Sequence, residues 1–215
     1  NRPMGFLYTP ELTRAPELPD LKLSQLFADF GWATIRTSWK KDATMLAVKS
    51  GHTWNHSHAD ANSFILFHKG VDIIKDAGNC WYPNPNYRNY FFQSQAHNVV
   101  LFNGQGQSRE QQYHGSTLRG YLYHLLDGGN IRYLLANGTG PVSDNFSRNF
   151  RHFLWIDNVI YMIDDLKTHR SGEFEWLWHP GGEWKKSGTD VTITKDNSSV
   201  VFVPHKQLYR QRQEL

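Results

Sequence analysis

Apolar and polar residues alternate along most of the chain after Gly31. A period of two is typical of β-strands, whose successive side chains face opposite sides of a sheet. The clearest example is "ATMLAVKSG", residues 43–51. The next stretch, "SFILFHKGVDIIKDAG", residues 63–78, holds two apolar runs on either side of His68-Lys69-Gly70. Short glycine-containing breaks of this kind predict a β-hairpin.

The same pattern continues to the end of the chain and predicts roughly ten strands. The further candidates are "HNVVLFNG", the pair "LRGYLYHLL" and "IRYLLANG", "FRHFLWIDNVIYMIDDL" with a two-residue turn at Asp157-Asn158, "EFEWLWH" and "VTITKDNSSVVFV". Residues 23–31, "LSQLFADFG", predict a short helix or turn, and no longer amphipathic helix is found. The expected fold is therefore all-β, an antiparallel β-sandwich of several stacked sheets.

The amino-terminal segment has a different composition. Residues 1–22 contain four of the nine prolines, which predicts an extended linking or wrapping segment ahead of one β domain, residues 23–215. The chain opens on Asn1 and closes on a polar stretch, so we expect both ends to be cuts through a longer protein.

Composition narrows the possible partners. The formal net charge is only +3 and no dense lysine and arginine stripe occurs, so a nucleic-acid partner is not expected. No apolar run reaches membrane-spanning length, so no membrane partner is expected either. Cys80 is the single cysteine and cannot form an intrachain disulfide. Aromatic residues make up 14% of the chain, which suits both sheet cores and sugar-binding surfaces.

Candidate chemistry begins in "WNHSHADANSF", residues 54–64. His56, His58 and Asp60 alternate and would face one side of an extended chain. The predicted hairpin brings Asp76 to the same end of the sheet, and His97 starts the next apolar run. Two imidazoles and one carboxylate with an open fourth position suit Zn²⁺. The pattern does not decide whether Asp60 or Asp76 is the carboxylate ligand.

Two other interpretations of the His-x-His pair remain open. One is a polar loop whose histidines are solvated, because such short pairs recur by chance. The other is a cupin-like fold, which also places His-x-His on a strand but follows it with a glutamate. Residues 61–64 are Ala-Asn-Ser-Phe, so the glutamate is missing.

Residues 54–82 and 87–107 together resemble the heparinase II/III-like polysaccharide lyases and the related alginate and oligoalginate lyases. The shared features are His-x-His-x-Asp, an apolar hairpin, Asp-x-Gly, Arg-x-Tyr-Phe and Ala-His-Asn, in that order. Gln93-Ser94 stands where many relatives have Arg-Ser-Thr, which leaves the substrate preference open. The likeness extends more weakly over most of the chain.

The resemblance implies specific roles. His58, Asp76 and His97 match the family's zinc ligands, and the metal is expected to shape the cleft. His56 matches a cleft-facing histidine beside the ligand. The family's substrate lies between this β-sandwich and an N-terminal α/α toroid, which this chain does not contain. The expected partners are thus an acidic polysaccharide and that toroid.

The expected reaction is β-elimination at a uronic acid, in which the C5 proton is removed and the C4–oxygen bond breaks. Its carboxylate must be neutralised, a base takes the proton and an acid, often tyrosine, serves the leaving oxygen. Candidate catalytic residues are His56, Tyr82 and Tyr90. Candidate substrate contacts are Asn55, Tyr87 and Arg88, although an Arg-x-Tyr-Phe run can also be a surface loop with buried aromatics. His179, which ends a predicted strand, is a weaker candidate.

The sequence thus predicts the β-sandwich part of a bacterial periplasmic or secreted lyase. Its substrate would be a uronate-containing polysaccharide of the glycosaminoglycan or alginate type. The alternative is a non-catalytic carbohydrate-binding or structural β module of a larger protein. An upstream helical toroid would favour the enzyme.

Overall fold

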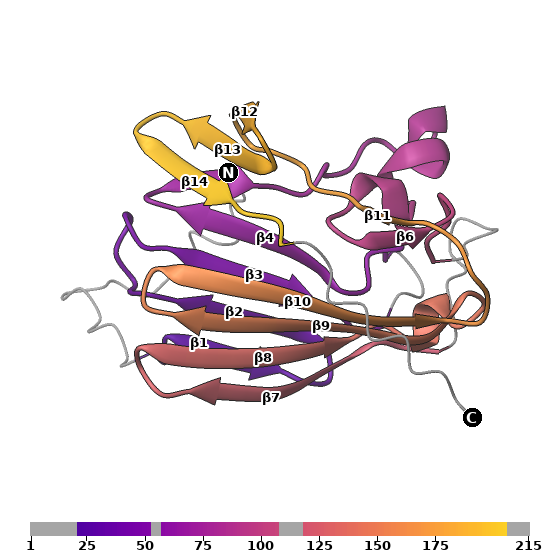
Figure 1. The fold of residues 1–215 in the computed structure, drawn as a ribbon, viewed down its shortest axis with the longest axis horizontal. Helices are drawn as coiled ribbons and strands as arrows, with labels where there is room; N and C mark the ends of the chain where they lie inside the picture. Colours follow the sequence, from indigo (N-terminus) through magenta and orange to yellow (C-terminus); the bar gives the residue numbers. More distant parts are fainter. Residues whose placement is uncertain (1–20, 53–56, 108–117, 206–215) are drawn as a thin grey trace, which may run out of the picture.

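A computed structural model describes residues 21–52, 57–107 and 118–205, and these form four antiparallel sheets (Figure 1). The proline-rich segment falls almost wholly outside the described residues. The largest sheet has five strands in sequence order: β1 (Ser24–Phe27), β2 (Trp32–Arg36), β3 (Met45–Lys49), β4 (Ser63–His68) and β5 (Val71–Ile74). The second has the order β10-β9-β8-β7, with β7 (Tyr121–Asp127), β8 (Ile131–Asn137), β9 (Phe146–Ile156) and β10 (Val159–Thr168). The predicted antiparallel multi-sheet sandwich is confirmed.

The main core lies between these two sheets. Alternate residues of β3 and β9 are buried, which is the pattern expected where one face of a strand meets a second sheet. The buried members from the five-stranded sheet are Ala33, Ile35, Leu46, Val48, Phe64, Leu66, Ile73 and Ile74. Those from the four-stranded sheet are Leu122, Leu134, Ala136, Phe153 and Trp155.

Two smaller sheets complete the described fold. The hairpins of β12 (Glu183–Ser187), β13 (Asp190–Lys195) and β14 (Ser198–Phe202) pack beside β5, and Ile193 joins the main core. β6 (Val100–Phe102) pairs with β11 (Phe174–Trp176) over a second core of Phe102, Val142 and Phe146. This long-range pairing brings the chain after β11 beside the chain before β6.

Both sequence-predicted turns are confirmed. β4 and β5 form a hairpin through Lys69 and Gly70, which adopt φ angles of 50° and 85°. β9 and β10 form another, with Asp157 at φ 49°. Left-handed conformations of this kind are what tight hairpin turns demand. No helix in the described ranges is long and apolar enough to cross a membrane.

The sequence reading was incomplete in two places. Residues 24–27 form strand β1 before a turn, and not a helix, because they pair with β2 along its whole length. Roughly ten strands were expected, whereas the described part of the chain has fourteen. β12 was missed because all its residues are exposed and show no alternation. The sandwich also rules out the cupin-like fold considered above.

One buried charge ties the two large sheets together. Arg151 on β9 is 1% exposed, and its Nε and Nη2 donate to the Asp164 carboxylate at 2.7 and 3.1 Å. Its Nη1 donates to the carbonyls of Asn62 and Asn98 at 2.9 and 2.7 Å. The Trp176 indole also donates to Asp164 at 2.7 Å. The guanidinium of Arg151 and the carboxylate of Asp164 therefore have hydrogen-bond partners within the protein, as buried charges require.

We expect Arg151→Met to lower the free energy of unfolding by about 3–5 kcal/mol, because it leaves the Asp164 carboxylate buried without its cation. Arg148→Met is the matched control. Arg148 faces Asp165 across the same two strands, but the side chains of this pair are 43% and 44% exposed. The control should cost at most about 1 kcal/mol. Urea denaturation of the three proteins measures both values, and equal losses would contradict the role given to Arg151.

Candidate functional site

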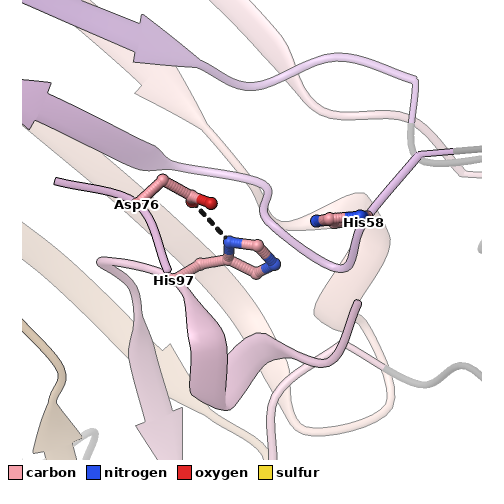
Figure 2. Close-up of side chains that lie close together, drawn as sticks. All are labelled: His58, Asp76 and His97. Atoms are coloured by element: carbon pink, nitrogen blue, oxygen red, sulfur yellow. Dashed lines mark hydrogen bonds and ion pairs between the residues drawn. The ribbon is translucent and has the colours of Figure 1, made fainter. Parts of the chain in front are cut away.

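Three potential metal ligands converge where three separate segments meet (Figure 2). Asp76 lies just after β5, His97 lies three residues before the start of β6, and His58 lies in the loop before β4. One ligand atom from each residue can be chosen so that all three lie within 4.8 Å of one another. The hairpin of β4 and β5 places His58 and Asp76 at the same end of the sheet, as the sequence predicted.

The geometry of the trio suits a small cation. Nδ1 of His97 lies 2.6 Å from Oδ2 of Asp76, and the His97 side chain is fully buried. Nε2 of His97 is buried without a hydrogen-bond partner, and its ring centre lies 5.2 Å from that of His58. A buried nitrogen with no partner is costly unless something else occupies its lone pair or proton. Two imidazoles and a carboxylate are the donors that Zn²⁺ prefers, so these residues fit the metal.

Electrostatics favour the ligand forms of these side chains. Burial lowers the pKa of the His58 imidazole, and the neighbouring His97 lowers it further, so His58 is neutral at pH 7. Burial alone would raise the pKa of the Asp76 carboxyl, but the hydrogen bond and charge of His97 outweigh it, and the pKa falls below its usual value. A neutral imidazole and an ionised carboxylate are what metal binding needs.

Asp60 is not one of the three residues that converge. Its Oδ2 accepts from Nζ of Lys49 at 2.7 Å, and the residue is nearly buried. The structure therefore groups Asp76 with the two histidines, which the alternation in the sequence left undecided. Asp60 remains close enough to favour protonation of His58 through its charge.

Asn98 connects the site to the sheets and was missed by sequence reasoning. Its Nδ2 donates to the carbonyls of Phe64 and Lys75 at 2.7 and 2.9 Å, and its own carbonyl accepts from Arg151. The residue follows the candidate ligand His97, and Lys75 precedes the candidate ligand Asp76. Asn98 therefore fixes the two ligand-bearing segments relative to each other. The only signal in the sequence was its place in Ala-His-Asn.

The tyrosines between Asp76 and His97 divide into two groups. Tyr82 and Tyr90 are 41% and 39% exposed, so both side chains are partly open to solvent. Tyr87 is 1% exposed and packs against the rings of Phe92, Tyr82 and His58. Tyr87 therefore supports the loop from the inside. Its side chain is buried, which argues against its predicted role as a substrate contact.

Tyr87 and Tyr90 belong to a single turn of wide helix, η1 (Tyr87–Phe91), which ends before the short helix η2 (Ser94–Ala96), whereas Tyr82 lies in a turn ahead of it. Arg88 on η1 is exposed, and its carbonyl accepts from the Gln93 side chain at 2.8 Å. The Arg-x-Tyr-Phe run is thus a surface loop in which Tyr90 is exposed and Phe91 half-buried, and the buried aromatics are its neighbours Tyr87 and Phe92. Arg88 stays available for an anionic ligand.

His179 enters the site more firmly than the sequence indicated. Its backbone N–H donates to Oδ1 of Asn98 at 2.7 Å, and Nε2 lies 3.5 Å from the Tyr90 hydroxyl. Burial lowers the pKa of its imidazole, followed by the charge of His97, although the Gln95 carbonyl acts in the opposite sense. The pairing of β6 with β11 is what carries His179 here, which no local pattern reveals. Asn55 and His56 lie outside the described residues, so their predicted roles stay predictions.

Comparison with known proteins places this fold among lyases. A heparin-sulfate lyase of Bacteroides stercoris is 26% identical over 178 residues, covering 80% of this chain and 25% of that protein. A heparin-sulfate lyase of Pedobacter heparinus is 30% identical over 88 residues, covering 39% and 13%. The chain therefore spans about a quarter or less of these relatives.

Solved structures show the same fold. A heparinase III structure with methylated lysines matches with a TM-score of 0.70 at 23% identity, covering 83% of this chain and 27% of that one. A mutant heparan sulfate lyase of Pedobacter heparinus matches with a TM-score of 0.67 at 22% identity, covering 83% and 28%. The family described as Heparinase II/III-like, C-terminal, matches residues 19–214. The chain belongs to the heparinase II/III-like family and forms its C-terminal domain.

Proposed function

We propose that this chain is the β-sheet wall of a polysaccharide lyase that cleaves a heparan-type glycosaminoglycan by β-elimination, with zinc held by His58, Asp76 and His97. The observation that carries the proposal is the cluster of His58, Asp76 and the buried His97 beside the exposed Tyr82 and Tyr90. The relatives named heparin-sulfate lyases support the substrate class within the broader glycosaminoglycan or alginate range.

Zinc bound there would supply a fixed positive charge that orders the loops. The acid–base chemistry itself would be carried out by side chains of this chain and of the proposed N-terminal domain. The C5 proton of a uronate is weakly acidic, and its adjacent carboxylate must be neutralised by hydrogen-bond donors before the proton leaves. Arg88 can bind two oxygens of a carboxylate or sulfate at once. Tyr82, Tyr90 and the sequence-predicted His56 are the candidates for proton transfer.

The rest of the active site is proposed to lie on other parts of a longer protein. The relatives are about four times the length that this chain matches, which supports an additional N-terminal domain. An α/α toroid would then complete the cleft, and the enzyme would act in the bacterial periplasm or outside the cell. If the longer protein binds acidic polysaccharide but releases no unsaturated product, the alternative of a non-catalytic carbohydrate-binding module is favoured.

Zinc content tests the ligand set. The purified chain should contain about one zinc per molecule, and His58→Ala should lose it while its circular dichroism stays β-rich. His68→Ala is the control, because His68 lies at the far end of β4 and bonds to Thr44. Elemental analysis reads out all three proteins. A folded wild-type chain that holds no zinc and is not stabilised by added zinc would overturn the assignment.

Acid should release the metal only below pH 6.5. Burial and the neighbouring His97 hold the pKa of the His58 imidazole below its usual value of about 6.5, so the neutral imidazole persists as the pH falls through that value. Protonation then removes the lone pair that binds zinc. Equilibrium dialysis across a pH series measures the bound zinc. Half-release above pH 6.5 would contradict the environment described for His58.

Product formation tests the reaction. The longer protein should release an unsaturated uronate from heparan sulfate, detected by its ultraviolet absorbance, in preference to hyaluronan, chondroitin and alginate. Tyr90→Phe and Tyr82→Phe should identify the reacting tyrosine, whose loss costs about 10²–10⁴-fold in kcat. Trp81→Phe provides a control for changes in the loop. A product with no double bond would exclude elimination.

A further inference from the structure

Contacts with several neighbours hold His179 between the two ligand-bearing segments, and the Gln95 carbonyl also interacts with its imidazole. Its backbone N–H and its ring Nδ1 both lie at hydrogen-bond distance from Oδ1 of Asn98, at 2.7 and 3.1 Å. Its carbonyl accepts from the backbone N–H of Lys75 at 3.0 Å. A further contact joins Nε2 to the Tyr90 hydroxyl. Both the backbone and the ring plane of His179 are therefore set by neighbours of Asp76 and His97.

The hydrogen bonds of Asn98 determine which ring nitrogen of His179 carries the proton. Nδ2 of Asn98 faces two carbonyl oxygens, those of Phe64 and Lys75, so it must be the amide nitrogen that donates. Oδ1 is then the acceptor, and it faces Nδ1 of His179. Nδ1 must carry a hydrogen to satisfy that contact. In a neutral imidazole, Nε2 is then the acceptor.

The direction of the last contact follows. Nε2 lies 3.5 Å from the Tyr90 oxygen. Because Nε2 carries no hydrogen, the Tyr90 hydroxyl must be the donor in this contact. The distance is at the outer limit for such a bond, and contacts of this kind commonly shorten when substrate binds. Tyr90 is 39% exposed, so its side chain is partly open to solvent while its hydrogen points to His179. The lone pairs of the oxygen are left for a ligand.

We propose that His179 is a positioning residue that holds the Tyr90 hydroxyl in one orientation, with its hydrogen on the imidazole and its lone pairs directed toward the substrate. The proposal rests on the proposed lyase function. With its hydrogen on the imidazole, the Tyr90 oxygen is oriented to accept a proton, so this orientation suits the base and not the acid that serves the leaving oxygen. A hydroxyl that is free to rotate spends only part of its time in that orientation. Asn98 thus serves both the ligand trio and the tyrosine loop.

The tautomer is tested on this chain without any activity. Nitrogen-15 NMR of the imidazoles at pH 7 should show His179 protonated on Nδ1 and bare on Nε2. Tyr90→Phe should shift the Nε2 resonance and leave Nδ1 protonated. A proton on Nε2, or on both nitrogens, would overturn the assignment, because Nε2 could no longer accept from Tyr90.

The positioning role is tested on the longer protein. His179→Ala should lower kcat about 10- to 100-fold, with KM and zinc content nearly unchanged. His179→Gln should recover most of the loss, because its amide oxygen can accept from Tyr90. His179→Ala combined with Tyr90→Phe should be no worse than Tyr90→Phe alone. The exposed His124 gives the control variant His124→Ala, expected to match wild type.

The outcomes separate the two proposals. Independent, multiplicative losses in the double variant, or a glutamine variant no better than alanine, would refute the positioning role. A wild-type protein that forms no unsaturated product would instead refute the lyase function, while the NMR result would still report on the hydrogen bond between His179 and Tyr90.

Discussion

The placement of the two large sheets and of the loops at the candidate site depends on one buried charge that needs hydrogen-bond partners. Arg151 sits almost without exposure in β9, and a guanidinium there is tolerated only because the Asp164 carboxylate and two backbone carbonyls take its hydrogen bonds. Those carbonyls belong to Asn62 and Asn98, which lie in loops of the opposite sheet and the ligand region. Satisfying the cation therefore also fixes where the two loops run. A hydrophobic side chain would fill the space without imposing that geometry.

The side-chain amides of Asn98 and Asn62 connect Arg151 to the candidate site through hydrogen bonds. The peptide of Asn98 is held by Arg151, while its side chain bridges β4, the end of β5 and the segment after β11. Asn62 acts similarly: its Nδ2 reaches Asn149 and its Oδ1 accepts from Ser50. Such networks are costly when incomplete and rigid when complete. A rigid frame suits ligands that need fixed positions, and the exposed tyrosines sit on the less regular turn beside it.

Much of the fold, and the approach of His58 to Asp76, could be predicted from the local pattern of apolar and turn residues. Alternation predicted the sandwich because one face of each major strand is buried, and the turn at Lys69-Gly70 fixed the register that joins His58 to Asp76. β12 was not predicted because it has no buried face, and β1 was not predicted because its four residues are too few to show an alternating pattern. Tyr87 was placed among substrate contacts, since composition cannot distinguish a buried aromatic ring from an exposed one.

By itself, the sequence determined the class of fold and named His58 and His97, with either Asp60 or Asp76, as candidate metal ligands, because strand period, turn residues and ligand chemistry are local properties. Only the tertiary structure placed Asp76, and not Asp60, in the cluster with the two histidines, gave Asn98 its connecting role and brought His179 to Tyr90. Each of these depends on long-range pairing: Asp60 is taken by Lys49, and the β6–β11 ladder joins residues more than seventy positions apart. Such pairings are set by the packing of the whole sandwich, which no short stretch of sequence contains.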